Sequence, residues 1–155
     1  MSGSAEIRSA LISRALAAAP GAALPQDVDT SGKHIFIDGL LEVFNPPAGK
    51  RWYRLAFIPG EPVPAALGDV AQNRHVGVFY VTVFWPTQGA AAGPTGITNG
   101  RQEAERIAQS YKRGTSFAYG GVNVFCEKAW VGQESTDVNF IGWPVKVQLY
   151  ADVDN

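Results

Sequence analysis

Acidic side chains are spaced like calcium ligands in one segment of the chain. Five residues match positions 1, 3, 5, 6 and 12 of an EF-hand loop, namely Asp27, Asp29, Ser31, Gly32 and Asp38. An EF-hand also needs a helix on each side of that loop. Pro20, Gly21 and Pro25 exclude a helix before it, and residues 34–37 have the pattern of a strand. We therefore predict a polar turn in this segment and no bound metal.

The other side chains that do chemistry in enzymes form no catalytic constellation. His34 and His75 each precede an expected strand and lack the spacing of metal ligands. Cys126 lies in an alternating apolar stretch, which is typical of a buried structural thiol. The sequence contains no nucleophile-elbow motif, no phosphate-binding P-loop motif and no dinucleotide-binding glycine motif. We therefore predict no catalytic residues and no cofactor.

Length, residue composition and charge exclude several further classes of protein. A length of 155 residues suits one domain, and 17% charged residues with 17 Gly and 10 Pro favour strands and turns over a helical bundle. The net charge is −1 and no Lys/Arg block is present, so the basic patch of a nucleic-acid binder is missing. No stretch approaches the ~20 apolar residues of a membrane helix, which predicts no membrane contact.

Two helices are expected where apolar residues recur at helical spacing. The first is expected at 4–18, capped by Ser4. The second is expected at 99–113, with Thr98 or Asn99 as its cap and Gly114, a residue able to take positive φ, after its end. The apolar stripes comprise Ile7, Leu11 and Ala15 in the first helix and Ala104, Ile107, Ala108 and Tyr111 in the second.

Strands are expected at 34–38, 40–44, 51–58, 76–85, 122–130 and 140–151. The strand at 76–85 is apolar on both faces, so helices, neighbouring elements or another subunit should cover both. The strand at 140–151 alternates apolar and polar residues, so one of its faces should meet solvent. This order predicts an α+β fold, a mixed or antiparallel β-sheet with two α-helices packed on it, as a single domain over 1–155.

The connection at 60–75 is the segment most typical of a functional loop. It joins two apolar strands, is long for a compact domain, and contains Pro62, Pro64 and Gly68. Arg74 at its exit is placed to pair with a carboxylate on a neighbouring subunit. The candidate interface residues are Pro62, Pro64, Arg74, His75, Trp85 and Gln88.

The four tryptophans leave two interpretations open. Trp52, Trp85 and Trp130 fall in expected strands, and Trp143 precedes Pro144. Such residues either pack in the core and at strand ends, or anchor an interface, where Trp, Tyr and Arg dominate the binding energy.

Five sequence blocks follow one another in a specific order over about 6–150. They are YRLAFIP at 53–59, NRHVG at 73–77, WPTQG at 85–89, an amphipathic helix ending at Arg113-Gly114, and Pro144-Val145 at the start of the last strand. No single block is diagnostic, but their order and spacing resemble the tail-terminator family of long-tailed bacteriophages.

This resemblance implies a structural virion protein with a tail-terminator-like fold and no enzymatic activity. It implies a homo-hexameric ring that closes the tail tube and offers a joining surface to head-completion or connector proteins. The implied location is the head-proximal end of the tail, after assembly in the bacterial host cytoplasm. Viral DNA would pass through the ring without specific binding. The alternatives are another tail-tube or head–tail connector component, or a small cytoplasmic enzyme or ligand-binding domain.

Overall fold

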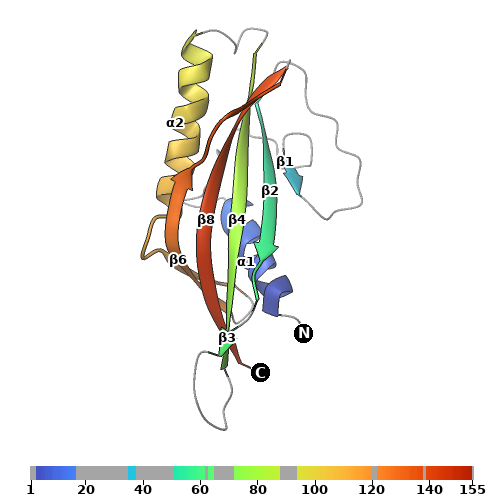
Figure 1. Ribbon diagram of the computed structural model, residues 1–155, viewed down its shortest axis with the longest axis vertical. Coiled ribbons are helices and arrows are strands. Elements are labelled where there is room, and N and C mark those ends of the chain that lie inside the picture. Colours follow the sequence, from blue (N-terminus) through green and yellow to red (C-terminus); the bar gives the residue numbers. More distant parts are fainter. Residues whose placement is uncertain are drawn as a thin grey trace.

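The structure is a computed structural model that describes residues 3–16, 35–37, 51–61, 63–64, 72–87, 94–119, 122–137 and 139–154. These residues form two helices and a single eight-stranded sheet (Figure 1). All described strand pairs are antiparallel except one parallel pair at the edge, so the sheet is mixed. The predicted α+β class, with two helices packed on such a sheet, is therefore confirmed.

The sheet has the strand order β1-β2-β4-β8-β6-β5. These strands are β1 (Ile35–Ile37), β2 (Trp52–Pro59), β4 (Gln72–Pro86), β8 (Phe140–Asp154), β6 (Val122–Val131) and β5 (Ser116–Tyr119). Two short strands lie off this path: β3 (Val63–Pro64) pairs with β4, and β7 (Ser135–Thr136) pairs with β8. Strand β1 is the parallel one, and it pairs with β2.

Strands β4 and β8 form the centre of the sheet. Each has 15 residues, and their antiparallel register runs from the Gln72–Asp154 pair to the Pro86–Phe140 pair. Because side chains alternate along a strand, this register gives the sheet two continuous faces. Phe79, Val81 and Val147 are fully buried on one of them.

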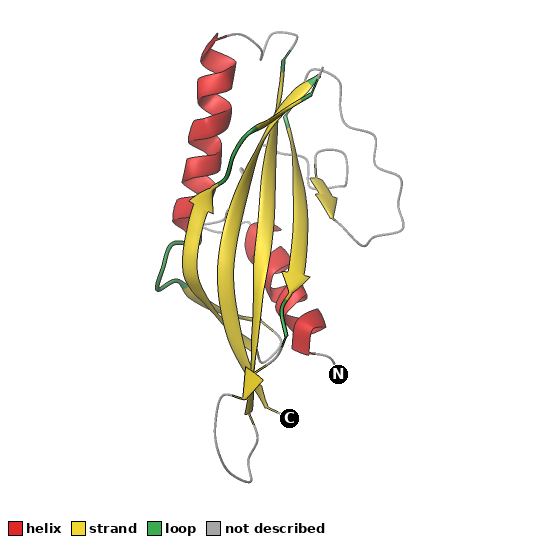
Figure 2. Cartoon of the chain, in the orientation of Figure 1, coloured by secondary structure: helices red, strands yellow, loops and turns green. Residues whose placement is uncertain are grey.

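Both helices cover that buried face (Figure 2). Helix α1 (Gly3–Leu16) buries Ile7 and Leu11, and helix α2 (Pro94–Ser110) buries Ile107. One core cluster joins them to the strands, and it also holds Tyr53, Leu55, Val83, Ala104, Tyr111, Val124, Trp143, Val145 and Leu149. The predicted stripes are confirmed at every position whose side chain is described, which leaves out Ala15.

Helix α2 lies unusually close to the sheet at one point. A Cβ atom on Gly100 would stand 2.4 Å from Cζ3 of Trp143, which is only 2% exposed. The indole of Trp143 donates a hydrogen bond to Glu134 Oε2 at 3.1 Å, so its ring is held in place. The absence of a side chain at Gly100 is therefore what lets the helix seat against this tryptophan.

A polar contact also ties α2 to the sheet. The buried Tyr53 hydroxyl on β2 donates to Glu103 Oε1 at 3.3 Å, and Glu103 accepts a second hydrogen bond from Arg106 Nη2 at 2.7 Å. Burial, and then the charge of Glu103, raise the pKa of Tyr53 well above its usual range. The tyrosine is thus held neutral, as a hydrogen-bond donor to the helix.

Several element boundaries differ from the sequence-based expectation. Helix α2 begins at Pro94 and ends at Ser110, so it continues through Asn99 instead of being capped there. Proline suits a first helical turn because its missing N–H has no partner there in any case. Helix α1 likewise begins at Gly3, one residue before the expected Ser4 cap.

Strand β4 begins at Gln72, and β3 pairs with it, so part of the 60–75 connection is a ladder rather than an open loop. The expected strand at 40–44 and the calcium-like spacing before residue 35 lie outside the described residues. Residues 35–37 form strand β1, as the strand pattern after that spacing predicts.

Candidate functional site

The second face of the sheet is covered by neither helix α1 nor helix α2. We call this surface the open face. Its described side chains are half-buried or exposed: Trp52, Arg54, Ala56, Ile58, Arg74, Val76, Val78, Tyr80, Thr82, Phe84, Phe125, Lys128, Trp130, Pro144, Lys146, Gln148, Tyr150 and Asp152. Helices α1 and α2 therefore cover only one face of β4, the strand expected at 76–85. The other face of β4 carries the second apolar row of that strand.

Aromatic side chains gather at the end of the open face where β2 begins. Trp52 stacks on Phe84 of the neighbouring strand with ring centroids 3.9 Å apart and planes 7° from parallel. Phe140 meets the same indole edge-on, at 6.0 Å and 86°. Cross-strand aromatic pairs of this kind stabilise the sheet, and the three rings are half-buried.

Cations lie over aromatic rings along the rest of this face. Lys146 Nζ is 6.0 Å from the ring centre of Tyr80, and Lys128 Nζ is 4.9 Å from that of Trp130. These distances are within the range of cation–π attraction. The open face thus alternates apolar rings with positive charge.

Arg74 is the centre of a third cluster on the open face, near the end of β8. Its guanidinium donates two hydrogen bonds to Asp152, Nε to Oδ1 at 2.8 Å and Nη2 to Oδ2 at 3.0 Å. It also lies 4.3 Å from the ring centre of Tyr150, which stacks on Phe125 at 5.2 Å. Arg74 thus has a carboxylate partner within its own chain, in register on the neighbouring strand. Its expected pairing with a carboxylate of a neighbouring subunit stays a prediction.

The pKa values of Asp152 and Arg74 reflect this pairing. The hydrogen bonds from Arg74 hold the pKa of Asp152 below its usual range. The pKa of Arg74 is raised chiefly by its hydrogen bond to Asp152, and in smaller part by the charge of Glu127. Glu127 sits where the register shifts between Cys126 and Lys128. The charges of this cluster therefore largely compensate one another.

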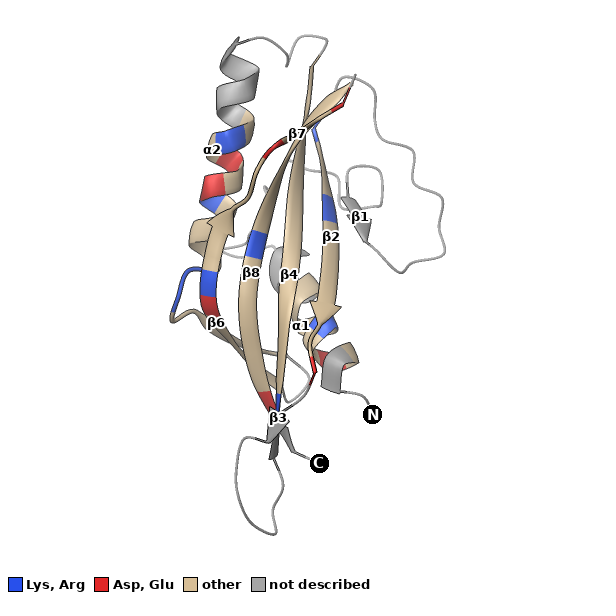
Figure 3. Cartoon of the chain, viewed as in Figure 1, with Lys and Arg blue, Asp and Glu red and all other residues tan. Residues whose placement is uncertain are grey.

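The middle of the open face is different, because it is positive. Arg54, Lys128 and Lys146 come from β2, β6 and β8, and Figure 3 shows the charged positions of these strands. Asp152 lies opposite Arg74 at one end, and Glu127 adjoins Lys128 on β6. Arg74 adds a fourth cation at one end of the face, where Asp152 pairs with it.

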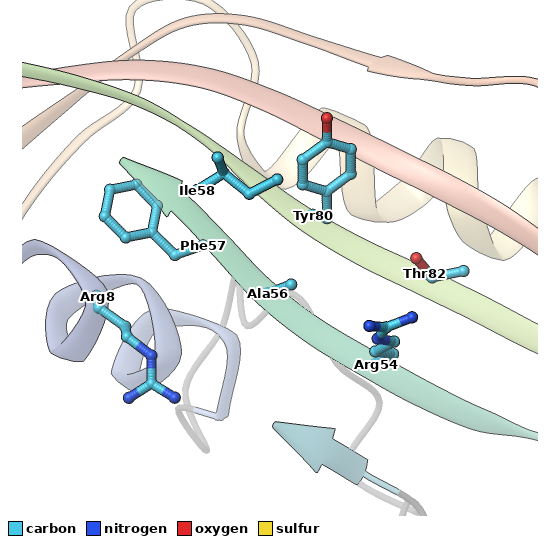
Figure 4. Close-up of a pocket in the computed structure, with 7 residues that line it drawn as sticks. All are labelled: Arg8, Arg54, Ala56, Phe57, Ile58, Tyr80 and Thr82. Carbon is cyan, nitrogen blue, oxygen red and sulfur yellow. The ribbon is translucent and has the colours of Figure 1, made fainter. Parts of the chain in front are cut away.

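A depression of about 460 Å³ lies beside β2, between the open face and helix α1. It is lined by Arg8, Arg54, Ala56, Phe57, Ile58, Tyr80 and Thr82 (Figure 4). Arg8 reaches it from helix α1, and the other residues come from β2 and β4. None of these lining residues is a carboxylate, histidine or cysteine, so they provide no acid–base or nucleophilic pair.

The described part of the chain likewise holds no group of three or more His, Cys, Asp or Glu side chains able to bind a metal. Of its helices, none is long and apolar enough to cross a membrane. Cys126 is buried at 3% exposure, as its apolar surroundings predict.

The structure separates the predicted interface residues. Pro62 and Gln88 lie outside the described residues, and Pro64 is placed only through its pairing with Asn73. His75 and Trp85 fall on the helix side of β4, where Trp85 packs against the core. Arg74 alone of the six has a described side chain on the open face.

Sequence reasoning did not select most residues of the open face. Trp52 and Trp130 were assigned to neither core nor interface, and both are half-buried on this face. The available signal was the second apolar row of the strand at 76–85, which includes Tyr80 and Phe84. The cations beside that row come from strands distant in sequence.

Fold and surface together define the chain as an α+β domain distinguished by one aromatic, basic sheet face rather than by a cluster of catalytic groups. The phage tail terminator protein family matches residues 6–148. The chain belongs to this family, and it is a structural component of phage tails and of the virion. The resemblance noted in the sequence is thereby confirmed.

Two further comparisons complete this result. A solved protein structure superposes with a TM-score of 0.63 at 22% identity, covering 97% of this chain and 96% of that one. At this identity the likeness supports the fold alone. A comparison with curated proteins finds no significant match.

Proposed function

We propose that six copies of the chain form a ring that terminates the tail tube and presents the joining surface to the head-completion protein. Viral DNA passes through this ring without specific binding. The observation that carries the proposal is membership of the tail terminator family over residues 6–148. The remaining partners are the tail tube protein on one side and the head-completion or connector protein on the other.

The shape of the domain supports ring formation. A closed ring is built from head-to-tail contacts, in which each subunit offers two different surfaces to its neighbours. This domain has two unlike faces, one covered by helices and one presenting aromatic rings and cations. Among the described strands, the two outermost ones, β1 and β5, also differ from each other. Sheet edges are common sites of association between chains.

The 60–75 connection is a second element of the proposal. Its base is the ladder of β3 with β4, which fixes the positions where it leaves and rejoins the sheet. Residues 65–71 between these strands lie outside the described residues. We assign them to contacts with the tail tube or a neighbouring subunit, because a connection of this length commonly carries function.

A complementation experiment tests the function. A phage lacking its own copy of the gene is supplied with the wild-type chain or with a variant in which residues 65–70 are replaced by a Gly-Ser linker that keeps β3. The wild type should restore capped tails of uniform length and infectious virions, seen by electron microscopy and plaque counts. The linker variant should fold normally but cap fewer tubes.

Native mass spectrometry of the assembled tail ends supplies the stoichiometry. Six copies per tail end agree with the proposed ring. Tubes that stop at normal length and join heads without the chain would refute termination, and copies distributed along the tube would assign it to the tube itself. Full activity of the linker variant would remove the 60–75 connection from the proposal while leaving the ring in place.

A further inference from the structure

We infer that the depression beside β2 is a binding site for an extended acidic peptide of a partner protein, which adds to the sheet as a strand next to Phe57. The site lies within one chain, so the inference goes beyond the proposed ring and does not depend on it. The volume of the depression, about 460 Å³, is in the range of ligand pockets.

The depression passes over the edge of β2. Its lining includes Ile58 of the open face and Phe57, whose side chain lies on the opposite face and packs against the core. Successive side chains of a strand point to opposite faces, so a hollow that reaches both must cross a strand edge. Strand β4 occupies one edge of β2, which leaves the other. Figure 4 shows helix α1, with Arg8, beyond this second edge.

The backbone at Phe57 is turned toward this edge. Gly60 N–H donates to Val76 O at 2.8 Å, so these two residues form a hydrogen-bonded pair. Bonded and non-bonded pairs alternate along an antiparallel ladder, and the register along β2 is unbroken. Phe57 falls an odd number of residues before Gly60, so its N–H and C=O point away from β4. Strand β1 pairs with β2 at 53–55, and none of the described strands pairs with β2 on this edge further along.

The side chains around Phe57 favour an acidic chain. Arg54 is exposed on the open face, and Arg8 reaches the depression from helix α1. A guanidinium has five N–H donors, so each arginine can bind a carboxylate in addition to its present contacts. Adjacent side chains of an extended peptide point to opposite faces, so neighbouring acids would reach the two arginines from either side of the sheet. Ile58, which is 56% exposed, would pack on an apolar side chain of the peptide.

A peptide matches this combination better than a nucleic acid does. When a strand adds to a sheet edge, backbone hydrogen bonds supply affinity and the surroundings of alternate side chains supply specificity. Binding of DNA instead depends on neutralising many phosphates with Lys and Arg. Here two arginines are divided between the two sides of one strand, with the apolar Phe57 and Ile58 beside them.

Fluorescence anisotropy tests the site with labelled peptides and the full chain. The acidic probe is Thr-Val-Glu-Asp-Val-Thr, and its neutral match has Gln and Asn in place of the two acids. We expect the acidic peptide to bind about tenfold more tightly at low salt, as one charge-assisted hydrogen bond can supply. Arg54→Gln and Arg8→Gln should each reduce this difference. Arg101→Gln, an equal change of charge at an exposed position of helix α2, should preserve it.

A second measurement tests strand addition with the protein unchanged. N-methylation of alternate peptide residues removes the N–H groups from one edge of an extended peptide. Methylation of one alternate set should abolish binding, because that edge faces β2, and methylation of the other set should leave binding nearly intact. In the ¹⁵N-labelled chain, the amide signal of Phe57 should shift when the unmodified peptide binds. The signal of the exposed Gln102 on helix α2 should not.

Four outcomes would overturn the inference. Absence of binding by either peptide at millimolar concentration would exclude the site. Equal affinity of the acidic and neutral peptides, or an equal loss in Arg101→Gln, would show that the two arginines do not select the ligand. Equal effects of the two methylated peptides would exclude strand addition. A short DNA duplex that displaces the peptide and binds more tightly would assign the site to nucleic acid. All of these measurements use the isolated chain, so their result is separate from the test of the proposed ring.

Discussion

Gly100 shows how a single missing side chain sets the position of helix α2. Alanine normally stabilises a helix interior by about 1 kcal/mol relative to glycine. At this position its Cβ would stand 2.4 Å from the Trp143 ring, so the helix or the indole would have to move. Overpacking of this kind typically costs about 1–3 kcal/mol. We therefore predict that Gly100→Ala lowers the free energy of unfolding, measured by urea denaturation.

Gln102→Ala is the matched control for this change, because Gln102 is exposed on the same helix. Its effect should stay within about 0.5 kcal/mol. A Gly100→Ala variant more stable than the wild type would mean that the helix does not seat against Trp143 as described.

The Arg74–Asp152 pair predicts how stability depends on pH. The folded state holds the pKa of Asp152 below its unfolded value, so the unfolded chain binds a proton more readily. The stabilisation is therefore present above the unfolded value of about 4 and is lost as the pH falls through the folded value. Thermal unfolding between pH 3 and 6 should show a shallower acid decline for Asp152→Asn than for the wild type.

Asp137→Asn serves as the comparison, because Asp137 is exposed and away from Arg74. If Asp152→Asn retains the full acid slope of the wild type, other carboxylates set that slope and the pair contributes little to it.

At the scale of elements, helix α2 docks through a small buried stripe. Ile107 is fully buried between Ala104, Ala108 and the strands of the core cluster. Truncating a buried isoleucine to alanine costs about 2–5 kcal/mol, because transfer energy is lost and a cavity remains. We predict this loss for Ile107→Ala in chemical denaturation, against a small effect for the exposed Gln109→Ala. A loss below about 0.5 kcal/mol, the range of surface changes, would place Ile107 outside the core.

The sequence predicted those helices and strands whose apolar periodicity lies within their own residues. The stripe of α2, the apolar strand at 76–85 and the alternation of Val145, Val147 and Leu149 follow from periodicities of 3.6 and 2. They appear in the structure as buried faces. Gly114 likewise takes the positive φ of 87° that its place after the helix favoured.

Boundaries that depend on distant partners could not be predicted in this way. The polar residues 72–75 carry no strand pattern, and they become strand because β3 and the end of β8 pair with them. The start of α2 was placed late because Thr98 and Asn99 are residue types that cap helices. Packing against Trp143, which is distant in sequence, is what favours Gly100 inside the helix.

The candidate site was predictable only in part for the same reason. The second apolar row of β4 is visible in the sequence, but the positions of Lys146 beside Tyr80 and of Lys128 beside Trp130 follow from the strand order β4-β8-β6. Arg74 was singled out to pair with a carboxylate of a neighbouring subunit, and within its own chain it meets Asp152. Which carboxylate it meets depends on a register between segments about half the chain apart.

At the scale of the whole molecule, the domain uses its two helices on one side only. A sheet that is apolar on one face and covered there can fold as a unit, while the other face tolerates partial exposure. The energetic cost of that exposure falls when another surface covers it. The one-sided arrangement thus makes assembly a natural complement of folding for this chain.

The central ladder of β4 and β8 also gives the domain a mechanical direction. Their 15 residue pairs lie side by side along the length of the molecule (Figure 1). A pull along the strands loads the ladder in shear, so its hydrogen bonds, which run across the strands, must fail together. A pull across the strands breaks these hydrogen bonds one after another. The domain should therefore resist tension far better along its long axis than across it.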